Sequence, residues 1–317
     1  MNVQVRRSYQ RHWGMGLLLL LAVAGCRREG VDPGVAPAEP VAAVQAMAER
    51  LAEDDLVGYA RLSVPPAQYA RLQQAWLQGH SRWPLTDLPL DDQLLPMLES
   101  LRRPDAAAQL KHSFDRQLAG QNSAVRQAAL SMGAFGVQYL RHQKGLTPTQ
   151  QTHYIQLIES LSRWAQAAPL SDRARARSSI SALVAAAGKV QVKDEDSLSA
   201  AGLEGSLQQL APFLHTLKAV LASYGLGVEE ALRSLRGEVL SLQGDNALVR
   251  LQYELAGDTL TVQVPLSRRE GHWYLTRTLA HTDALLRKAA AAEAESAGAA
   301  NPAPAEAGEV TPPPATP

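Results

Sequence analysis

The spacing of apolar residues changes once along the chain, close to Gly237, and this change constrains the fold more than any other feature. From residue 41 to about residue 235, apolar residues recur every three or four positions, as they do on one face of a helix. After Gly237 they alternate with polar residues, as they do in a strand with one buried face. The sequence therefore predicts an α+β fold that is mainly α. A multi-helix region, 41–235, packs as one domain with a three- or four-stranded antiparallel meander and its closing helix, 236–288.

The helical region contains one clear helix start and one long apolar row. Thr147-Pro148-Thr149-Gln150 combines a hydroxyl cap, a first-turn proline and a glutamine three residues after the cap. The helix that it opens is expected to bury Ile155 or Leu157, Ile158, Leu161, and Trp164 with Ala165. The apolar row predicts a helix at the centre of the core, kinked at Pro212. It consists of Leu203, Leu207, Leu210, Leu214, Leu217, Leu221 and Tyr224. The polar stretch before it, 189–202, is expected to be a loop.

A second apolar row follows a cap at Asn122 or Ser123. Its steps of three and four predict a buried helix face. The row consists of Val125, Ala129, Met132, Phe135 with Gly136, and Tyr139 with Leu140. Gly133 and Gly136 lack side chains and allow two helices to approach closely, so we interpret them as packing positions.

Two turn signals, Gly244-Asp245-Asn246 and Ala256-Gly257-Asp258, separate the strands. Pro265 has no N–H, so we expect it at a sheet edge or where pairing stops. The stretch GDNALVRLQYELAGDTLTVQVPLSRREGHWYL is similar to the sheet end of the nuclear-transport-factor-2-like superfamily of small cone-shaped α+β domains. That resemblance implies strands that pack on helices and can enclose a pocket.

Residues 1–25 have the three parts of a secretory signal peptide. Three arginines and no acidic residue precede an apolar run, Gly14 to Gly25, that is too short for a bilayer-spanning helix of ~20 residues. Val23-Ala24-Gly25-Cys26 then resembles the lipobox of bacterial lipoproteins. The resemblance implies lipid attachment to the Cys26 thiol, cleavage by signal peptidase II between Gly25 and Cys26, and acylation of the new amino terminus.

The lipoprotein resemblance also implies a location and a layout. In lipoproteins of double-membrane bacteria an Asp after the cysteine favours the inner membrane, whereas this chain has Arg27. The resemblance therefore implies an outer-membrane anchor, with the folded domain in the periplasm. Residues 26–40 comprise the lipidated cysteine and a Pro- and Gly-rich tether. Residues 289–317 are an Ala/Pro-rich tail that we expect to be disordered, although its Ala-rich start can prolong the closing helix.

Composition and motifs argue against several classes of function. Without the three leader arginines, 28 basic residues face 31 acidic ones, and no concentrated basic face predicts a nucleic-acid partner. Cys26 is the only cysteine and the histidines are scattered, so we predict no metal site and no cofactor. We found no nucleophile elbow or phosphate loop, and hence no catalytic constellation. Three acidic pairs fit capping positions at helix ends: Asp54-Asp55, Asp91-Asp92 and Glu229-Glu230.

Three functions remain open from the sequence. The first is a membrane-anchored lipoprotein, not an enzyme, that binds or scaffolds another envelope protein or polymer. The second is a small-ligand carrier with an apolar pocket between the 203–224 helix and the sheet around Tyr253 and Trp273. Trp83, in a proline-bearing loop, is a further candidate lining residue. The third is a hydrolase whose acidic residues meet only on folding.

Overall fold

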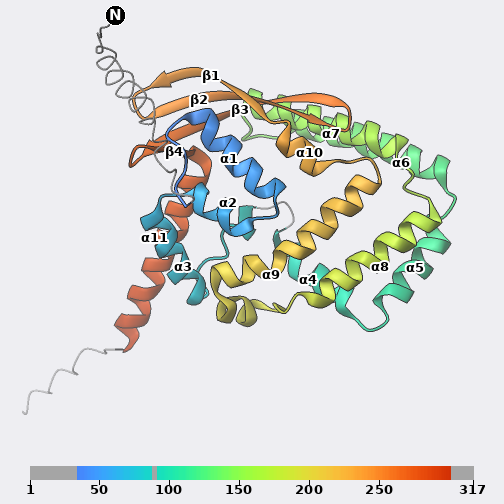
Figure 1. Cartoon of the computed structure of the whole chain (residues 1–317), viewed down its shortest axis with the longest axis horizontal. Helices are drawn as coiled ribbons and strands as arrows, with labels where there is room; N and C mark the ends of the chain where they lie inside the picture. Colours follow the sequence, from blue (N-terminus) through green and yellow to red (C-terminus); the bar gives the residue numbers. More distant parts are fainter. Residues whose placement is uncertain (1–33, 88–90, 301–317) are drawn as a thin grey trace, which may run out of the picture. The chain divides into compact units, whose positions relative to one another are not determined.

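The computed structural model describes residues 34–87 and 91–300, in which ten α-helices and one short 3₁₀ helix (Leu85–Asp87) precede a four-stranded antiparallel sheet and one α-helix follows it (Figure 1). This arrangement confirms the predicted α+β, mainly α, fold class. Gly25 and Cys26 lie outside the described residues. The strands are β1 (Arg236–Gln243), β2 (Asn246–Leu255), β3 (Asp258–Arg269) and β4 (His272–Leu275). The helices are α1 (Pro40–Ala52), α2 (Leu56–Ser63), α3 (Pro66–Leu77), α4 (Asp91–Arg102), α5 (Ala106–Gln117), α6 (Asn122–His142), α7 (Pro148–Ala167), α8 (Arg173–Lys189), α9 (Glu195–Ser223), α10 (Val228–Arg233) and α11 (Thr276–Ala300).

The sheet is a meander in which each strand pairs with the next. Both predicted turns are present. Gly244 has a φ of +58°, and Ala256 and Gly257 have φ values of +54° and +86°, as tight hairpins require. On one side of β3, β4 pairs with the short segment Leu266–Arg269. Pro265 directly precedes this segment, so it lies where pairing stops, as predicted.

Helix α7 covers the part of β3 that β4 does not reach (Figure 1). Thr261 donates its N–H to the side-chain oxygen of Gln156 (3.2 Å), and its carbonyl oxygen lies 3.2 Å from Nδ1 of His153. The hydroxyl of Ser160 donates to the carbonyl of Leu255 (3.0 Å). An open strand edge tends to pair with other chains, so the two contacts at Thr261 protect the free edge of β3.

Two apolar clusters hold the fold together. One lies between the sheet and α1, and it includes Ala43, Val44, Met47, Val249, Leu251 and Trp273. The larger one lies among α2, α3 and α9, where Trp76 is fully buried. The indole Nε1 of Trp76 donates to the carbonyl of Leu198 (2.8 Å), which satisfies its polar atom inside the core.

Helix α9 is the helix predicted at the centre of the core. Leu203, Leu207 and Leu210 are buried, as expected. The backbone, however, leaves the helical conformation at Gly202 (φ +70°), whereas Pro212 lies at an exposed position inside the helix. A residue without a side chain adopts this left-handed conformation at little cost, and it therefore forms the break.

The predicted loop over 189–202 is wrong for most of its length, because α9 already begins at Glu195. Asp194 accepts a hydrogen bond from the N–H of Ser197 (2.8 Å), and the Ser197 hydroxyl interacts with the N–H of Asp194 (3.0 Å). This capping box starts the helix before the apolar row begins. The capping box therefore allows the polar residues from Glu195 onward to form a helix.

The last part of the predicted tether, residues 34–39, lies within the described residues and packs on the body. Ala36 is buried with Tyr274 and Leu279, and the carbonyl of Pro37 accepts a hydrogen bond from the N–H of Trp273 (3.3 Å). Residues 34–39 thus pack on the sheet end of the body before α1 begins.

The Ala-rich start of the predicted tail prolongs the closing helix, as the sequence allowed, because α11 continues to Ala300. Alanine has the highest helix propensity, and Leu286 and Ala289 pack into the larger core cluster. The remainder of the predicted tail, 301–317, lies outside the described residues.

The buried face of α6 differs from the prediction. Gly133 and Gly136 face α7, and a Cβ added at Gly133 would lie 2.3 Å from Oγ of Ser162, so the predicted close approach is present. Three large side chains predicted to be buried face solvent instead, with exposed fractions of 74% for Met132, 73% for Phe135 and 57% for Tyr139. The side of α6 with the smallest residues meets α7, which leaves the large residues outside.

Candidate functional site

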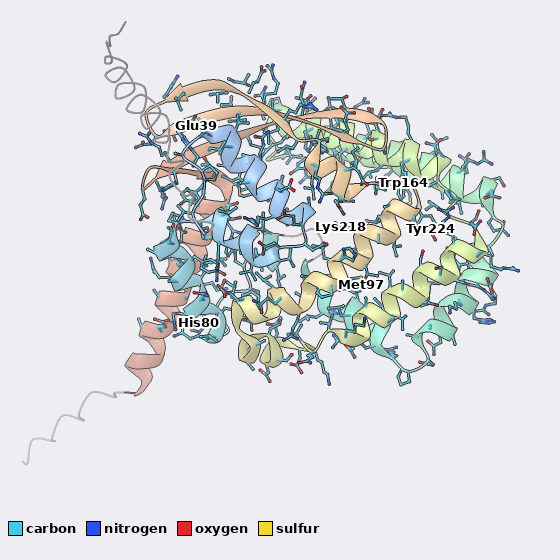
Figure 2. All side chains as sticks on the ribbon, viewed as in Figure 1. Glu39, His80, Met97, Trp164, Lys218 and Tyr224 are labelled. Carbon is cyan, nitrogen blue, oxygen red and sulfur yellow. The ribbon has the colours of Figure 1, made fainter. Side chains whose placement is uncertain are left out.

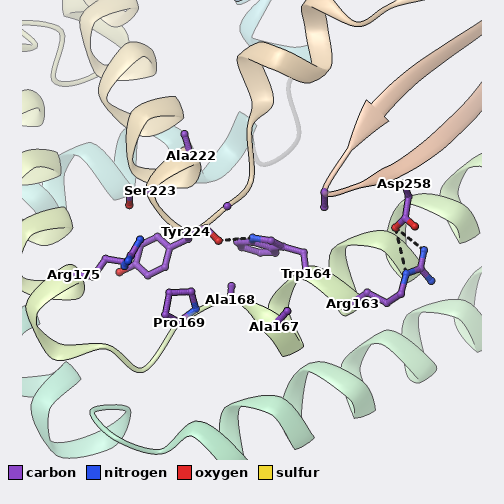
Figure 3. Close-up of a pocket in the computed structure, with 12 residues that line it drawn as sticks. Arg163, Trp164, Ala167, Ala168, Pro169, Arg175, Ala222, Ser223, Tyr224 and Asp258 are labelled. Carbon is purple, nitrogen blue, oxygen red and sulfur yellow. Dashed lines mark hydrogen bonds and ion pairs between the residues drawn. The ribbon is translucent and has the colours of Figure 1, made fainter.

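A surface concavity of about 710 Å³ lies where the ends of α7 and α9 meet the first turn of α8 and the turn between β2 and β3 (Figure 3). We call it the Trp164–Tyr224 concavity. Two aromatic residues, two arginines and one carboxylate line it, together with small residues and Pro169. Three stretches of the sequence form it, 163–175, 222–225 and 256–258, and they meet only on folding.

The two aromatic residues are held by one hydrogen bond. Nε1 of Trp164 donates to the carbonyl oxygen of Tyr224 (2.8 Å; Figure 3). Tyr224 caps α9, and the last carbonyls of a helix have no partner within it. The bond therefore satisfies the helix end and fixes the indole in the wall of the concavity.

The Arg175 guanidinium lies over the Tyr224 ring, 5.7 Å from its centroid, in a cation–π contact. Within residues 34–87 and 91–300 this guanidinium makes no hydrogen bond and no ion pair. Its five N–H donors are thus available to a ligand. The planar group is also positioned for an anion, because the ring below restricts its orientation.

Arg163 and Asp258 form an ion pair on the opposite side of the concavity (2.7 Å; Figure 3). The hydrogen bond from Arg163 lowers the pKa of the Asp258 carboxyl below its ordinary value, so this group stays ionised at neutral pH. Arginine stays protonated as well. The charged groups of the concavity therefore hold fixed charges, which suits binding better than proton transfer.

A second polar cluster lies at the end of α1. Lys218 of α9, which Figure 2 labels, is 4% exposed, and its Nζ donates to the carbonyls of Leu51 (2.8 Å) and Ala52 (2.7 Å). Nζ also lies 2.8 Å from a carboxylate oxygen of Asp54, and the other oxygen lies 2.8 Å from Nδ1 of His215. Asp54 and His215 border a groove of about 590 Å³ beside α8 and α9.

Helix capping explains this second cluster well. Asp54 has a φ of +62° directly after α1, a position where helices commonly end in the left-handed conformation. An Asp–His pair is also part of a general-base system. The hydroxyl that borders the groove, that of Thr216, donates to the carbonyl of Pro212 (3.0 Å), so it is not aligned on His215 as a nucleophile.

The structure does not bring the candidate ligand-lining residues Trp83, Tyr253 and Trp273 together. Trp83 is fully buried in the larger core cluster, and its Nε1 donates to the Asp87 carboxylate (2.8 Å). Trp273 is 3% exposed in the cluster under the sheet. Tyr253 is half-buried against the ring of His153. Since both tryptophans fill the core, they present no surface to a ligand.

Sequence reasoning placed Trp164 and Tyr224 in buried rows and overlooked Arg175. One signal was present. Residues 102–189 contain 12 Lys and Arg but only 4 Asp and Glu, an excess that the balanced charge of the whole chain conceals. The concavity itself has no local signature, because its walls come from four separate elements.

Comparisons with protein families, curated proteins and solved structures found no match. The two resemblances read from the sequence stay predictions. In the part of the chain that the structure describes, no helix combines the length and apolar character needed to cross a bilayer. In the same residues, no three His, Cys, Asp or Glu side chains lie close enough to hold a metal ion.

Proposed function

We propose that this chain is a lipid-anchored, non-enzymatic protein of the bacterial envelope that binds another envelope component. The lipobox-like Val23-Ala24-Gly25-Cys26 after a short apolar run supports the anchor. Two or more acyl chains hold a protein stably on a membrane, at ~0.8 kcal/mol for each buried CH₂ group. Arg27 supports an outer-membrane location with the body in the periplasm.

The Arg175 guanidinium over Tyr224 is the observation that carries the binding role. It offers unused donors beside two aromatic residues in a concavity large enough for a small molecule or a short chain segment. A ligand that bears a carboxylate or another anionic group next to a flat apolar face matches these walls. The anion would bind Arg175, and the flat face would lie against Tyr224 or Trp164.

The anchor is tested with Cys26→Ser. We expect the variant to fold but to be absent from membranes or to remain an unprocessed precursor, because the serine hydroxyl does not accept the lipid. Membrane fractionation and mass spectrometry of the N-terminal peptide measure this. A processed Cys26→Ser protein that still fractionates with membranes would contradict the anchor.

The concavity is tested by photo-crosslinking in living cells. A photoreactive amino acid at the exposed Ser223 should form one defined adduct, and Arg175→Ala in the same chain should remove it. The same amino acid at the exposed Ala134 of α6 is the matched control and should give no such adduct. An adduct that persists in the Arg175→Ala chain would contradict a ligand held by this guanidinium.

A small-ligand carrier is the second candidate function. The concavity joins the β2–β3 turn to the end of α9, so it connects the two elements between which the sequence predicted a pocket. Native mass spectrometry of protein purified from membranes separates the two functions. A stoichiometric small molecule that Arg175→Ala releases would favour the carrier, and a bare chain with a macromolecular crosslink would favour the binding protein.

A further inference from the structure

Helix α6 carries an uncharged apolar row on its solvent side, which the proposed function does not use. The row follows steps of three and four and consists of Ala124, Ala128, Met132, Phe135 and Tyr139. Met132 and Phe135 are the two most exposed large apolar residues in the described part of the chain. Such a continuous row is typical of a helix face that another surface covers.

The inner side of α6 is already occupied. Gly133 lies against Ser162, Gly136 lies against Ile158, and the carbonyl of Ala129 accepts a hydrogen bond from the Ser162 hydroxyl (3.0 Å). The contact with α7 therefore fixes which side of α6 faces outward. The rings of Phe135 and Tyr139 are stacked, 6.5 Å apart, so the outer row presents a formed surface.

The sizes of the row's residues identify the occupant. Phe135 and Ala128 are equally far from the point midway between Ser131 and Met132, and so are Tyr139 and Ala124. A second α6, antiparallel about a two-fold axis through this point, sets each aromatic ring opposite an alanine. Met132 lies beside the axis. Two large–small pairs with one common centre make the row complementary to itself.

The charges on α6 agree with this arrangement. The helix contains no acidic residue, and its arginines, Arg126 and Arg141, lie at helical angles roughly opposite the row. Pairing two copies through the row therefore points these guanidinium groups away from the contact. An acidic partner protein would find no basic residue within the row.

We propose that α6 packs antiparallel against α6 of a second copy of this chain, about a two-fold axis between Ser131 and Met132. One helix face is smaller than the ~800 Å² that each partner contributes to a standard interface. Anchoring both copies in one membrane raises their effective concentration, and this part of the inference rests on the proposed lipid anchor.

Cysteine crosslinking of the full chain in its membrane tests the pairing. Met132→Cys places two thiols beside the two-fold axis, within reach of a disulfide after mild oxidation. Leu130→Cys is the matched control, because Leu130 is 50% exposed on the same helix but points to another side. We expect a crosslinked dimer from Met132→Cys, at a yield at least about tenfold above that of the control.

A second variant tests the aromatic–alanine pairs. Phe135→Glu in the Met132→Cys chain should remove the crosslink, because two carboxylates would face apolar surface. Leu130→Glu in the same chain should leave it unchanged. Equal yields from the two cysteine variants, no dimer from Met132→Cys, or a crosslinked product of another mass would each overturn the proposal.

The unsubstituted protein distinguishes a failure of the α6 pairing from a failure of the lipid anchor. Its single cysteine, Cys26, does not react with maleimide in the denatured protein if lipid occupies the thiol. Labelled parent protein overturns the anchor. Unlabelled parent protein with no Met132→Cys dimer overturns the pairing of α6 and leaves the anchor in place.

Discussion

Helices α3 and α6 carry apolar residues at the same helical spacing, but these residues are buried on α3 and exposed on α6. Tyr69, Leu72 and Trp76 of α3 lie in the core and are at most 7% exposed. On α6, Met132 and Phe135 are more than 70% exposed. Apolar spacing thus predicts the helix and its apolar face in both cases. It does not decide whether that face is covered by the same chain.

The neighbours of each helix explain the difference. Helix α3 lies among α2, α9 and α11, and its large side chains fill the space between them. Helix α6 packs along α7, and the glycines on its inner side bring the two backbones close together (Figure 1). Close backbone contact stabilises this pair without the large residues, which the fold then leaves at the surface.

Alanine substitutions should show the largest contrast between the two helices. We expect Trp76→Ala to lower the free energy of unfolding by about 3–5 kcal/mol, because it leaves a cavity and removes one of the two side-chain hydrogen bonds to the carbonyl of Leu198. Phe135→Ala should change it by less than about 0.5 kcal/mol in dilute, monomeric protein. Urea unfolding of the purified variants measures both. A large loss for Phe135→Ala would show that its ring packs within the chain.

Two glycine-to-alanine substitutions should change the free energy of unfolding by smaller amounts and in opposite directions. Gly133→Ala should destabilise the fold by about 1–3 kcal/mol, because the new Cβ would lie 2.3 Å from Oγ of Ser162. Gly188→Ala in the exposed last turn of α8 meets no atom within 4 Å and should stabilise the fold by about 0.4–1 kcal/mol. Thermal unfolding of both variants checks the signs. Equal behaviour would mean that α6 and α7 are not in close backbone contact.

The elements that local chemistry specifies were predictable. The change of period near Gly237 placed the sheet, and Gly244 and Gly257 form the turns that their positions indicated. Thr147 and Gln150 form the expected capping box at the start of α7. Each of these features depends on residues within one turn or one hairpin, so the sequence reports them directly.

The features that depend on distant contacts were missed. No spacing shows that Ser162 would meet Gly133 and turn the large residues of α6 outward. The Trp164–Tyr224 concavity likewise needs the end of α9, reached only after its break at Gly202, beside the first turn of α8. Apolar spacing gave Trp164 and Tyr224 the same role as core residues, because it does not register which helix ends meet.

The pH dependence of unfolding should give the smallest effect. It concerns the side of α7 that packs on the edge of β3. Burial lowers the pKa of His153 below its ordinary value of 6.5, and its ring contacts the carbonyl of Thr261 on the edge of β3. The unfolded chain therefore binds this proton more readily than the folded chain. The contribution of His153 to stability is complete above about pH 6.5 and is lost as the pH falls through the lower folded-state pKa.

His153→Gln keeps an N–H donor but does not titrate, so its urea midpoint should fall less between about pH 8 and pH 5 than that of the parent protein. If the midpoint of the variant fell as steeply as that of the parent protein, α7 would not bury this ring against the strand edge. The side of α7 that faces the sheet would then be as open to water as the outer row of α6.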